Sequence, residues 1–140
     1  MKELQRYILK NGLKVTPQRL AVLKILIGNR SHPTAEKIHH ELLKEYPAIS
    51  LKTVYDVLAK FVEAEMIRKL DIDQKKMRFD GCVDPHDHFH CRVCDNVFDV
   101  VYEERDRADN LRKNNYDGHR VDSVRINLKG VCKNCEGTVA

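Results

Sequence analysis

The first third of the chain repeats its apolar residues at helical spacing, interrupted by short polar stretches. Residues 2–10 (KELQRYILK) predict a short amphipathic helix that stops at an Asn-Gly pair. Thr16 and Pro17 predict the start of a second helix, with Thr as the N-cap and Pro at the first helical position. Its apolar stripe continues until Gly28, which is expected to end it.

Two further helices and a hairpin are expected next. The segment HPTAE at 32–36 predicts the start of a third helix that runs to about Tyr46. Ser50 is expected to cap a fourth helix, whose apolar residues form one buried stripe. Residues 66–80 then read as a β-hairpin with its turn at 73–75.

Helices followed by a hairpin predict a winged helix-turn-helix over residues 1–80, although plain α+β domains share this layout. The fourth helix would then be the recognition helix. Its polar face carries the candidate DNA contacts Lys52, Tyr55, Asp56 and Lys60. The hairpin would form a wing on the phosphates through Arg68, Lys69, Lys75, Lys76 and Arg78.

Beyond residue 80 the pattern changes to short apolar runs. Residues 88–93 and 96–102 predict two strands, and residues 103–115 predict a polar surface helix. Residues 120–131 alternate, so we expect a strand with one buried face, formed by Val124, Ile126 and Leu128. Together these strands predict a small three-stranded sheet, which has too little core to be secure alone.

Charge divides the chain into two halves. Residues 1–80 carry 16 Lys and Arg against 10 Asp and Glu, whereas residues 81–140 carry 9 against 11. This asymmetry indicates a polyanion-binding half joined to a metal-sensing half, although an unevenly charged surface is also common. No run approaches ~18 apolar residues and the N-terminus lacks an apolar signal core, so we expect no membrane span and a reducing, cytoplasmic location.

Four of the five cysteines form two Cys-x-x-Cys pairs separated by 37 residues. Two such pairs can supply four thiolates in a tetrahedron, which is the closed coordination of a structural zinc ion. Disulfides or free thiols are the alternative. We therefore predict a zinc site on Cys91, Cys94, Cys132 and Cys135.

Histidines and aspartates crowd the segment around the first cysteine pair. His86 and His88 alternate, so on a strand they point the same way, and Asp80 and Asp99 flank them. Imidazole and carboxylate ligands suit Fe(II), Mn(II) or Zn(II) rather than a metal that prefers thiolates. A solvated loop of acidic residues and histidines is the alternative.

At this point the sequence closely resembles the ferric uptake regulator (Fur) family of bacterial metal-dependent repressors. The matching segments cover nearly the whole chain in order: TPQR at 16–19, HPTAEKI at 32–38, YPAISLKTVYDVL at 46–58, RFDG at 78–81, PHDHFHCRVC at 85–94 and GVCKNC at 130–135. The resemblance implies a winged-helix DNA-binding domain over 1–80 and a small α/β dimerisation domain over 81–140. It also implies a homodimer that binds palindromic operators in double-stranded DNA in the bacterial cytoplasm.

The resemblance further implies a regulatory metal between the domains. By motif position, its ligands are His32, Asp80, His86, His88 and Asp99. Iron-responsive members usually carry glutamate at the two acidic positions, whereas peroxide-sensing members carry aspartate at both, as this chain does. It therefore implies that Fe(II) or Mn(II) binds there, and that peroxide oxidises His32 and His86 and releases the DNA. An iron-responsive repressor of the same architecture is the alternative.

Some positions depart from the family pattern. Asp56 stands where relatives usually carry Asn or Arg, so a base or phosphate contact is expected to change. Arg19, in the matching segment TPQR, is expected to contact the DNA backbone. His90 and His119 are extra histidines that we expect on the surface, and Cys82 is a fifth thiol with a surface or packing role.

Two other classes of function fit parts of the sequence. A zinc hydrolase would use three protein ligands and a water, but no general base is placed for it and the basic half would have no role. A zinc-ribbon interaction module would account for the cysteines, and it predicts that replacing Tyr55 or Lys52 leaves DNA affinity unchanged. We expect a regulator and not an enzyme.

Overall fold

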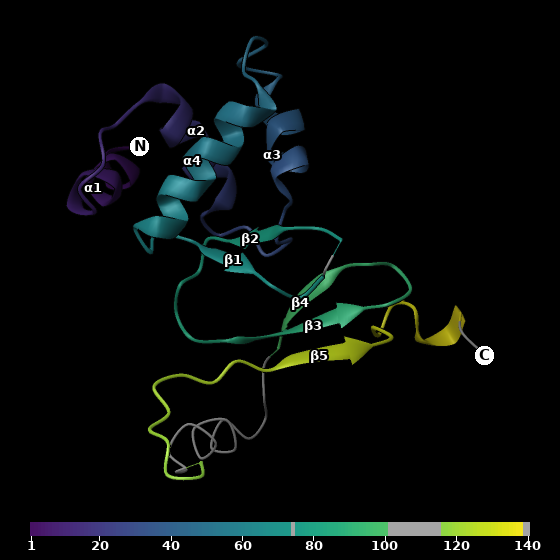
Figure 1. Cartoon of the computed structure of the whole chain (residues 1–140). Coiled ribbons are helices and arrows are strands. Elements are labelled where there is room, and N and C mark those ends of the chain that lie inside the picture. Colours follow the sequence, from purple (N-terminus) through teal and green to yellow (C-terminus); the bar gives the residue numbers. More distant parts are fainter. Residues whose placement is uncertain (74, 101–115, 139–140) are drawn as a thin grey trace. The chain divides into compact units, whose positions relative to one another are not determined.

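The computed structural model describes residues 1–73, 75–100 and 116–138. The chain divides into two compact units, Met1–Val83 and Asp84–Ala140. The first unit holds four helices and a two-stranded sheet, and the described part of the second holds a three-stranded sheet (Figure 1). The α+β class predicted from the sequence is confirmed.

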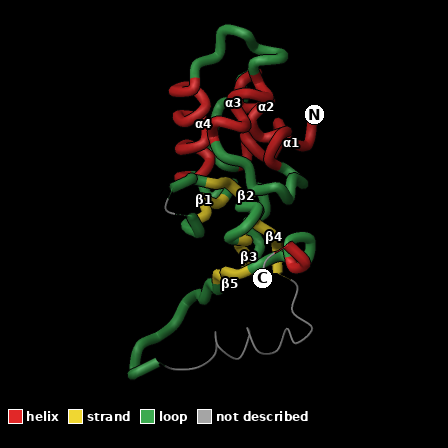
Figure 2. Tube along the Cα trace, turned by 90° about the vertical axis from the view of Figure 1, so that its right-hand side faces the viewer, coloured by secondary structure: helices red, strands yellow, loops and turns green. Residues whose placement is uncertain are grey.

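Four helices build the first unit: α1 (Lys2–Lys10), α2 (Pro17–Leu26), α3 (Ala35–Leu42) and α4 (Leu51–Glu63). Three of them begin at a hydroxyl side chain that accepts a backbone N–H three residues later, and these caps are Thr16, Thr34 and Ser50. Figure 2 shows the helices, in red, packed around one another. The expected starts of the second and fourth helices are confirmed.

The third helix is shorter than expected. It ends at Leu42 rather than near Tyr46, because the next residues form tighter turns. The amides of Lys44 and Glu45 donate to carbonyls three residues earlier, at 3.4 and 3.1 Å, which is 3-10 rather than α-helical bonding. The Tyr46 amide still reaches the Leu42 carbonyl at 2.8 Å, which closes the last turn.

The core of the first unit is apolar and completely covered. Leu23, Ile38, Leu58 and Phe61 each have a relative exposure of 0%. They come from α2, α3 and α4, so the buried stripes predicted for these helices meet in one cluster. No helix in the described residues is long and apolar enough to cross a bilayer.

A short hairpin follows α4. Its strands β1 (Arg68–Leu70) and β2 (Arg78–Asp80) pair antiparallel, with Lys69 opposite Phe79. Strand β2 also contacts the segment before α3, because the Phe79 amide donates to the Pro33 carbonyl at 3.0 Å and Thr34 forms an isolated antiparallel bridge with Arg78. The hairpin therefore fixes the loop that carries His32.

Gly81, directly after β2, packs against the end of α2. A β-carbon there would lie 2.4 Å from the Leu26 carbonyl oxygen, closer than real β-carbons come. We expect Gly81→Ala to destabilise the protein by about 1–3 kcal/mol and to lower the urea midpoint of helix unfolding. Gly137→Ala is the matched control, since no atom lies within 4 Å of its β-carbon. Equal midpoints for the two variants would contradict this packing.

The second unit is built on a sheet with strand order β4-β3-β5. Strand β3 (Asp87–Cys91) pairs antiparallel with β4 (Val97–Val100) and parallel with β5 (Asn127–Gly130). A short 3-10 helix (Glu136–Thr138) follows the last strand. The predicted three-stranded sheet is confirmed.

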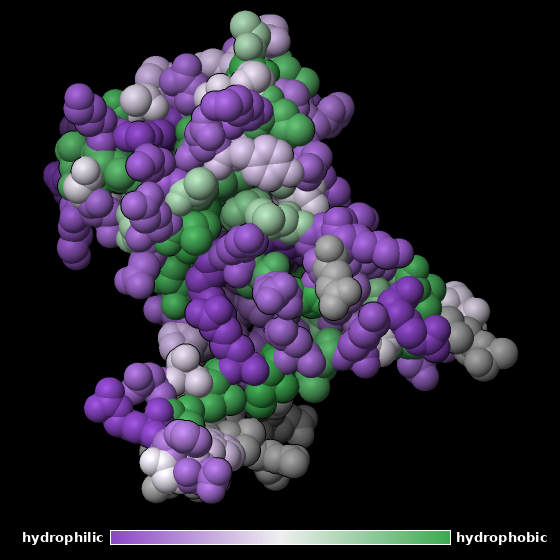
Figure 3. Space-filling model, in the orientation of Figure 1, coloured by the Kyte–Doolittle hydropathy of each residue, from purple (hydrophilic) through white to green (hydrophobic). Residues whose placement is uncertain are grey.

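The expected long strand over 120–131 is wrong. Only Asn127–Gly130 pairs with β3, and its Leu128 is 40% exposed instead of buried. Figure 3 shows a row of hydrophobic surface, in green, where Figure 1 draws β5 and the segment before it. The alternation of apolar and polar residues does not by itself specify which strand a segment pairs with. Among the described residues, 120–126 form no hydrogen-bonded strand pairing. The helix expected over 103–115 lies outside the described residues.

Candidate metal centres and recognition helix

The four paired cysteines come together at one end of the three-stranded sheet. Cys91 ends β3 and Cys94 lies in the turn after it, while Cys132 and Cys135 lie in the turn after β5. Because β3 and β5 run parallel, the two turns leave the sheet at the same edge. One Sγ from each cysteine lies within 4.8 Å of the others, and all four thiols are free.

The electrostatics of this cluster favour a cation. Backbone N–H groups, from Cys94 first and then from Cys132, lower the pKa of Cys91 to about 6, although burial opposes them. The hydrogen bond to Cys132 and burial raise the pKa of Cys135 to about 12. Four thiols this close cannot all ionise without a compensating charge, and four thiolates in this arrangement fit a tetrahedral zinc ion.

A second donor set lies on one face of the same sheet. His88 pairs with Asp99 in the β3–β4 register, and its Nε2 lies 3.5 Å from the Asp99 Oδ1. The Nε2 of His86 lies 3.3 Å from the same oxygen, and the two rings meet edge to face at 4.6 Å. The prediction that His86 and His88 point the same way is confirmed. We call these three residues the sheet donors.

Asp87, between the two histidines in the sequence, has a structural role in the sheet. It is 3% exposed, and its carboxylate accepts the Ile126 amide at 2.9 Å. This bond lies at the start of β5, so Asp87 helps to fix that strand beside β3. Sequence reasoning did not single out Asp87.

The first unit holds a donor pair of its own. His32 is fully buried, with a relative exposure of 0%, and its Nε2 lies 3.4 Å from the Asp80 Oδ2. Asp80 is 3% exposed, and its other oxygen accepts the Cys82 amide at 2.9 Å. Without the family resemblance, His32 reads as a surface residue, and that interpretation is wrong. We call His32 and Asp80 the loop donors.

Both donor sets have the chemistry of a borderline or hard divalent metal. Each combines imidazole nitrogen with carboxylate oxygen and contains no thiolate. Such donors fit Fe(II), Mn(II) or Zn(II). The described residues that form them are mostly buried, which lowers the competition from water.

The remaining histidines and the fifth cysteine have different surroundings. His90 is 7% exposed and its Nε2 lies 2.7 Å from the Asp95 Oδ1, so the expectation of a surface residue is wrong. His90 lies within β3, two residues after His88, and its partner Asp95 follows the turn that carries Cys94. His119 and Cys82 are exposed, as expected.

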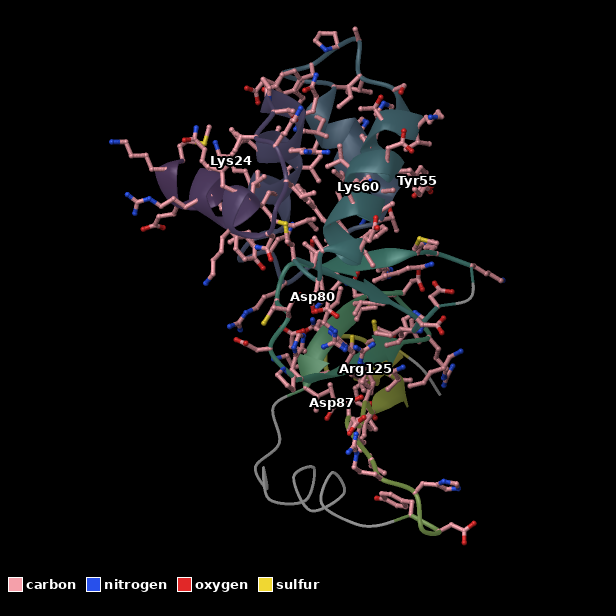
Figure 4. The ribbon with its side chains drawn as sticks, turned by 60° about the vertical axis from the view of Figure 1, so that its left-hand side comes forward. Lys24, Tyr55, Lys60, Asp80, Asp87 and Arg125 are labelled. Atoms are coloured by element: carbon pink, nitrogen blue, oxygen red, sulfur yellow. The ribbon has the colours of Figure 1, made fainter. Side chains whose placement is uncertain are left out.

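The exposed face of α4 carries the residues predicted to contact DNA. Figure 4 shows Tyr55 and Lys60 on this helix. Lys52 and Asp56 are exposed and form an ion pair at 3.1 Å, one turn apart. Arg19, half-buried at the start of α2, donates to the Lys14 carbonyl at 2.8 Å.

Tyr55 has a partner that sequence reasoning missed. Its hydroxyl donates to Glu36 Oε1 at 2.5 Å, which joins α4 to the first turn of α3. This bond lowers the pKa of Glu36 and raises the pKa of Tyr55. Glu36 belongs to the HPTAEKI segment, but only the packing of α3 on α4 shows which residue it meets.

A groove lies between the start of α3, Tyr55 and the hairpin. Its exposed cations include Lys37, Lys69, Lys75 and Lys76. Arg78 also lines this groove but is only 5% exposed, so its expected place on an open wing is wrong. Its Nη1 donates to the His32 carbonyl at 3.2 Å.

Known proteins resemble this chain in sequence and in fold. The family model for the ferric uptake regulator family matches residues 10–129. The peroxide-responsive repressor PerR of Staphylococcus saprophyticus is 34% identical over 126 residues, which cover 90% of this chain and 84% of that protein. The crystal structure of the Campylobacter jejuni peroxide stress regulator is 30% identical, with a TM-score of 0.69 over 96% of this chain and 97% of that chain.

A second solved structure extends the likeness to an iron regulator. The Helicobacter pylori ferric uptake regulator Fur is 25% identical, with a TM-score of 0.78 over 96% of this chain and 90% of that chain. The family match covers both units, including all but the last of the segments that carry the sequence resemblance. The chain therefore belongs to the ferric uptake regulator family of metal-dependent transcriptional repressors, and it is a regulator and not an enzyme.

Proposed function

We propose that this chain is a repressor that senses peroxide through oxidation of its own histidine ligands. The observation that carries the proposal is the acidic residue in each donor set, which is aspartate in both, Asp80 and Asp99. The similarity to peroxide-responsive repressors over 90% of the chain supports it. The alternative within the family is a repressor that responds to iron availability.

In this proposal one regulatory metal ion takes both donor sets. The loop donors are too few to hold an ion firmly, and the sheet donors leave coordination positions unfilled. An ion that binds all five residues would favour the arrangement of the two units that binds DNA, because its affinity for that arrangement is higher. A separate zinc ion on the four cysteines would hold the second unit folded.

The chemistry of the switch concerns His32 and His86. The donor residues would hold Fe(II), which would supply the electron transfer that activates peroxide, whereas Mn(II) would not. In the net change one oxygen atom enters a carbon–hydrogen bond of an imidazole, which gives up two electrons while the peroxide is reduced to water. The altered ring no longer holds the metal with its former geometry. The two units then lose the link that favours DNA binding.

Exchanging both aspartates for glutamates tests this proposal. The Asp80→Glu and Asp99→Glu double variant keeps the donor chemistry but moves each carboxylate outward by one methylene. We expect histidine oxidation in the iron-loaded variant to slow by about tenfold or more, equivalent to about 1.4 kcal/mol in the barrier. The measurement is mass spectrometry of peptides that contain His32 or His86 after peroxide treatment. Unchanged oxidation in a variant that still binds Mn(II) would remove the role proposed for the aspartates.

The DNA would be bound through α4, with Lys52, Tyr55 and Asp56 at the base edges and Lys60 and Arg19 at the phosphates. We expect Tyr55→Ala to weaken operator binding by about tenfold, the value of one good base contact. Fluorescence anisotropy of Mn(II)-loaded protein on a palindromic operator measures this loss. Tyr116→Ala, at an exposed turn in the second unit, is the control. Equal affinities for the two variants would favour a protein-interaction module.

The protein would bind its operator as a homodimer. A palindromic site repeats its half-sites by two-fold symmetry, and a two-fold symmetric pair of recognition helices matches it. Exposed lysines line the groove beside Tyr55, so we expect operator affinity to fall steeply with salt, since each phosphate contact releases counterions.

A further inference from the structure

His32 has an unusual backbone. Its φ is +52°, in the left-handed region that residues with a side chain seldom adopt. Such a conformation persists only where the surrounding structure holds it in place. The residue is also completely buried, so solvent contributes nothing to its orientation.

Three contacts from β2 hold this loop. The Arg78 guanidinium donates through Nη1 to the His32 carbonyl at 3.2 Å. The Phe79 amide donates to the Pro33 carbonyl at 3.0 Å, and Thr34 bridges to Arg78. The first contact is made by a side chain, so a substitution can remove it while the backbone contacts remain.

We propose that Arg78 is a positioning residue for the metal ligand His32: its buried guanidinium fixes the left-handed backbone and so aims the imidazole at Asp80. The proposal rests on the proposed function, in which His32 binds the regulatory metal. According to this proposal, the protein fixes the positions of His32 and Asp80 relative to each other before the metal binds. Arg78 acts through the His32 backbone, because its Nη1 donates to the His32 carbonyl.

The chemistry of arginine suits this role better than that of lysine. The guanidinium is planar, always charged and presents donors in a fixed fork, so it can reach a backbone carbonyl from a buried position in one defined orientation. A lysine keeps the charge but has a single flexible ammonium. Arg78→Lys therefore separates the loss of geometry from the loss of charge.

The test measures Mn(II) affinity of the zinc-loaded full chain by competition with a fluorescent metal indicator. We expect Arg78→Lys and Arg78→Gln to weaken Mn(II) binding by about 10–100-fold, as removal of the groups that orient metal ligands does. Lys24→Gln, which removes an exposed cation from α2, is the matched control and should leave the affinity unchanged. Zinc content and circular dichroism show whether each variant is folded.

A double-mutant cycle separates positioning from general structure. In a His32→Ala background, Arg78→Lys should have no further effect on Mn(II) affinity, because the ligand through which it acts is gone. An equal loss in both backgrounds would overturn the proposal and assign Arg78 a general structural role, as would unchanged affinity in Arg78→Lys and Arg78→Gln. If His32→Ala itself leaves Mn(II) affinity unchanged, the regulatory site and this inference both fail. If only the Arg78 variants have no effect, the proposed function stands and the inference alone fails.

Discussion

Replacing Cys132 with serine is expected to abolish zinc binding and to unfold the unit Asp84–Ala140. The four cysteines lie at the end of a sheet of short strands, and the described part of this unit has few fully buried apolar side chains. A structural zinc site contributes roughly 10–16 kcal/mol in small zinc-dependent folds, far more than such a core can replace. The loss should therefore be of the fold and not only of the metal.

Zinc content by elemental analysis and unfolding followed by circular dichroism measure this effect. Cys82→Ser is the control, because Cys82 is exposed and belongs to neither cysteine pair. The first unit has a separate apolar core, so its helices should remain in the Cys132→Ser variant. A zinc-free protein that keeps its full cooperative unfolding transition would show that the cysteines are not a structural site.

The second large effect concerns the histidine ligands. We expect His32→Ala and His86→Ala each to weaken Mn(II) binding by about 100-fold or more, equivalent to about 2.7 kcal/mol, and to abolish metal-dependent DNA binding. His32 is one of two loop donors and His86 one of three sheet donors, so each change leaves one set depleted. If one ion binds both donor sets, the loss of a ligand from either unit should weaken Mn(II) binding to a similar extent.

The control for these variants is His119→Ala, since His119 is exposed at a turn. Metal affinity by competition and DNA affinity by anisotropy should fall together in the ligand variants and stay unchanged in the control. Loss of metal binding in His86→Ala with full binding in His32→Ala would separate the two donor sets. The shared regulatory site would then be wrong.

Local signals in the sequence predicted most of the framework. Hydroxyl caps at Thr16 and Ser50 identified helix starts, because the capping bond forms within four residues. The two cysteine pairs predicted their own cluster, since a metal with four thiolates requires them to meet. Alternation of His86 and His88 gave their common direction.

The errors concern contacts that depend on tertiary packing. His90 and Arg78 are polar residues in short strands, where exposure is the ordinary expectation, yet both are buried beside specific partners. The apolar alternation before β5 did not show that pairing is limited to Asn127–Gly130. Sequence spacing also did not reveal that Glu36 meets Tyr55 nineteen residues later.

We propose that iron makes this repressor responsive to peroxide. The most direct measurement is fluorescence anisotropy on a palindromic Fur-type operator, with anaerobic Fe(II)-loaded and Mn(II)-loaded protein before and after stoichiometric peroxide. We expect that both forms bind, and that only the iron form releases the DNA and gains an oxygen atom at His32 or His86. Retention of DNA by both forms would contradict it and leave a repressor that responds to metal availability.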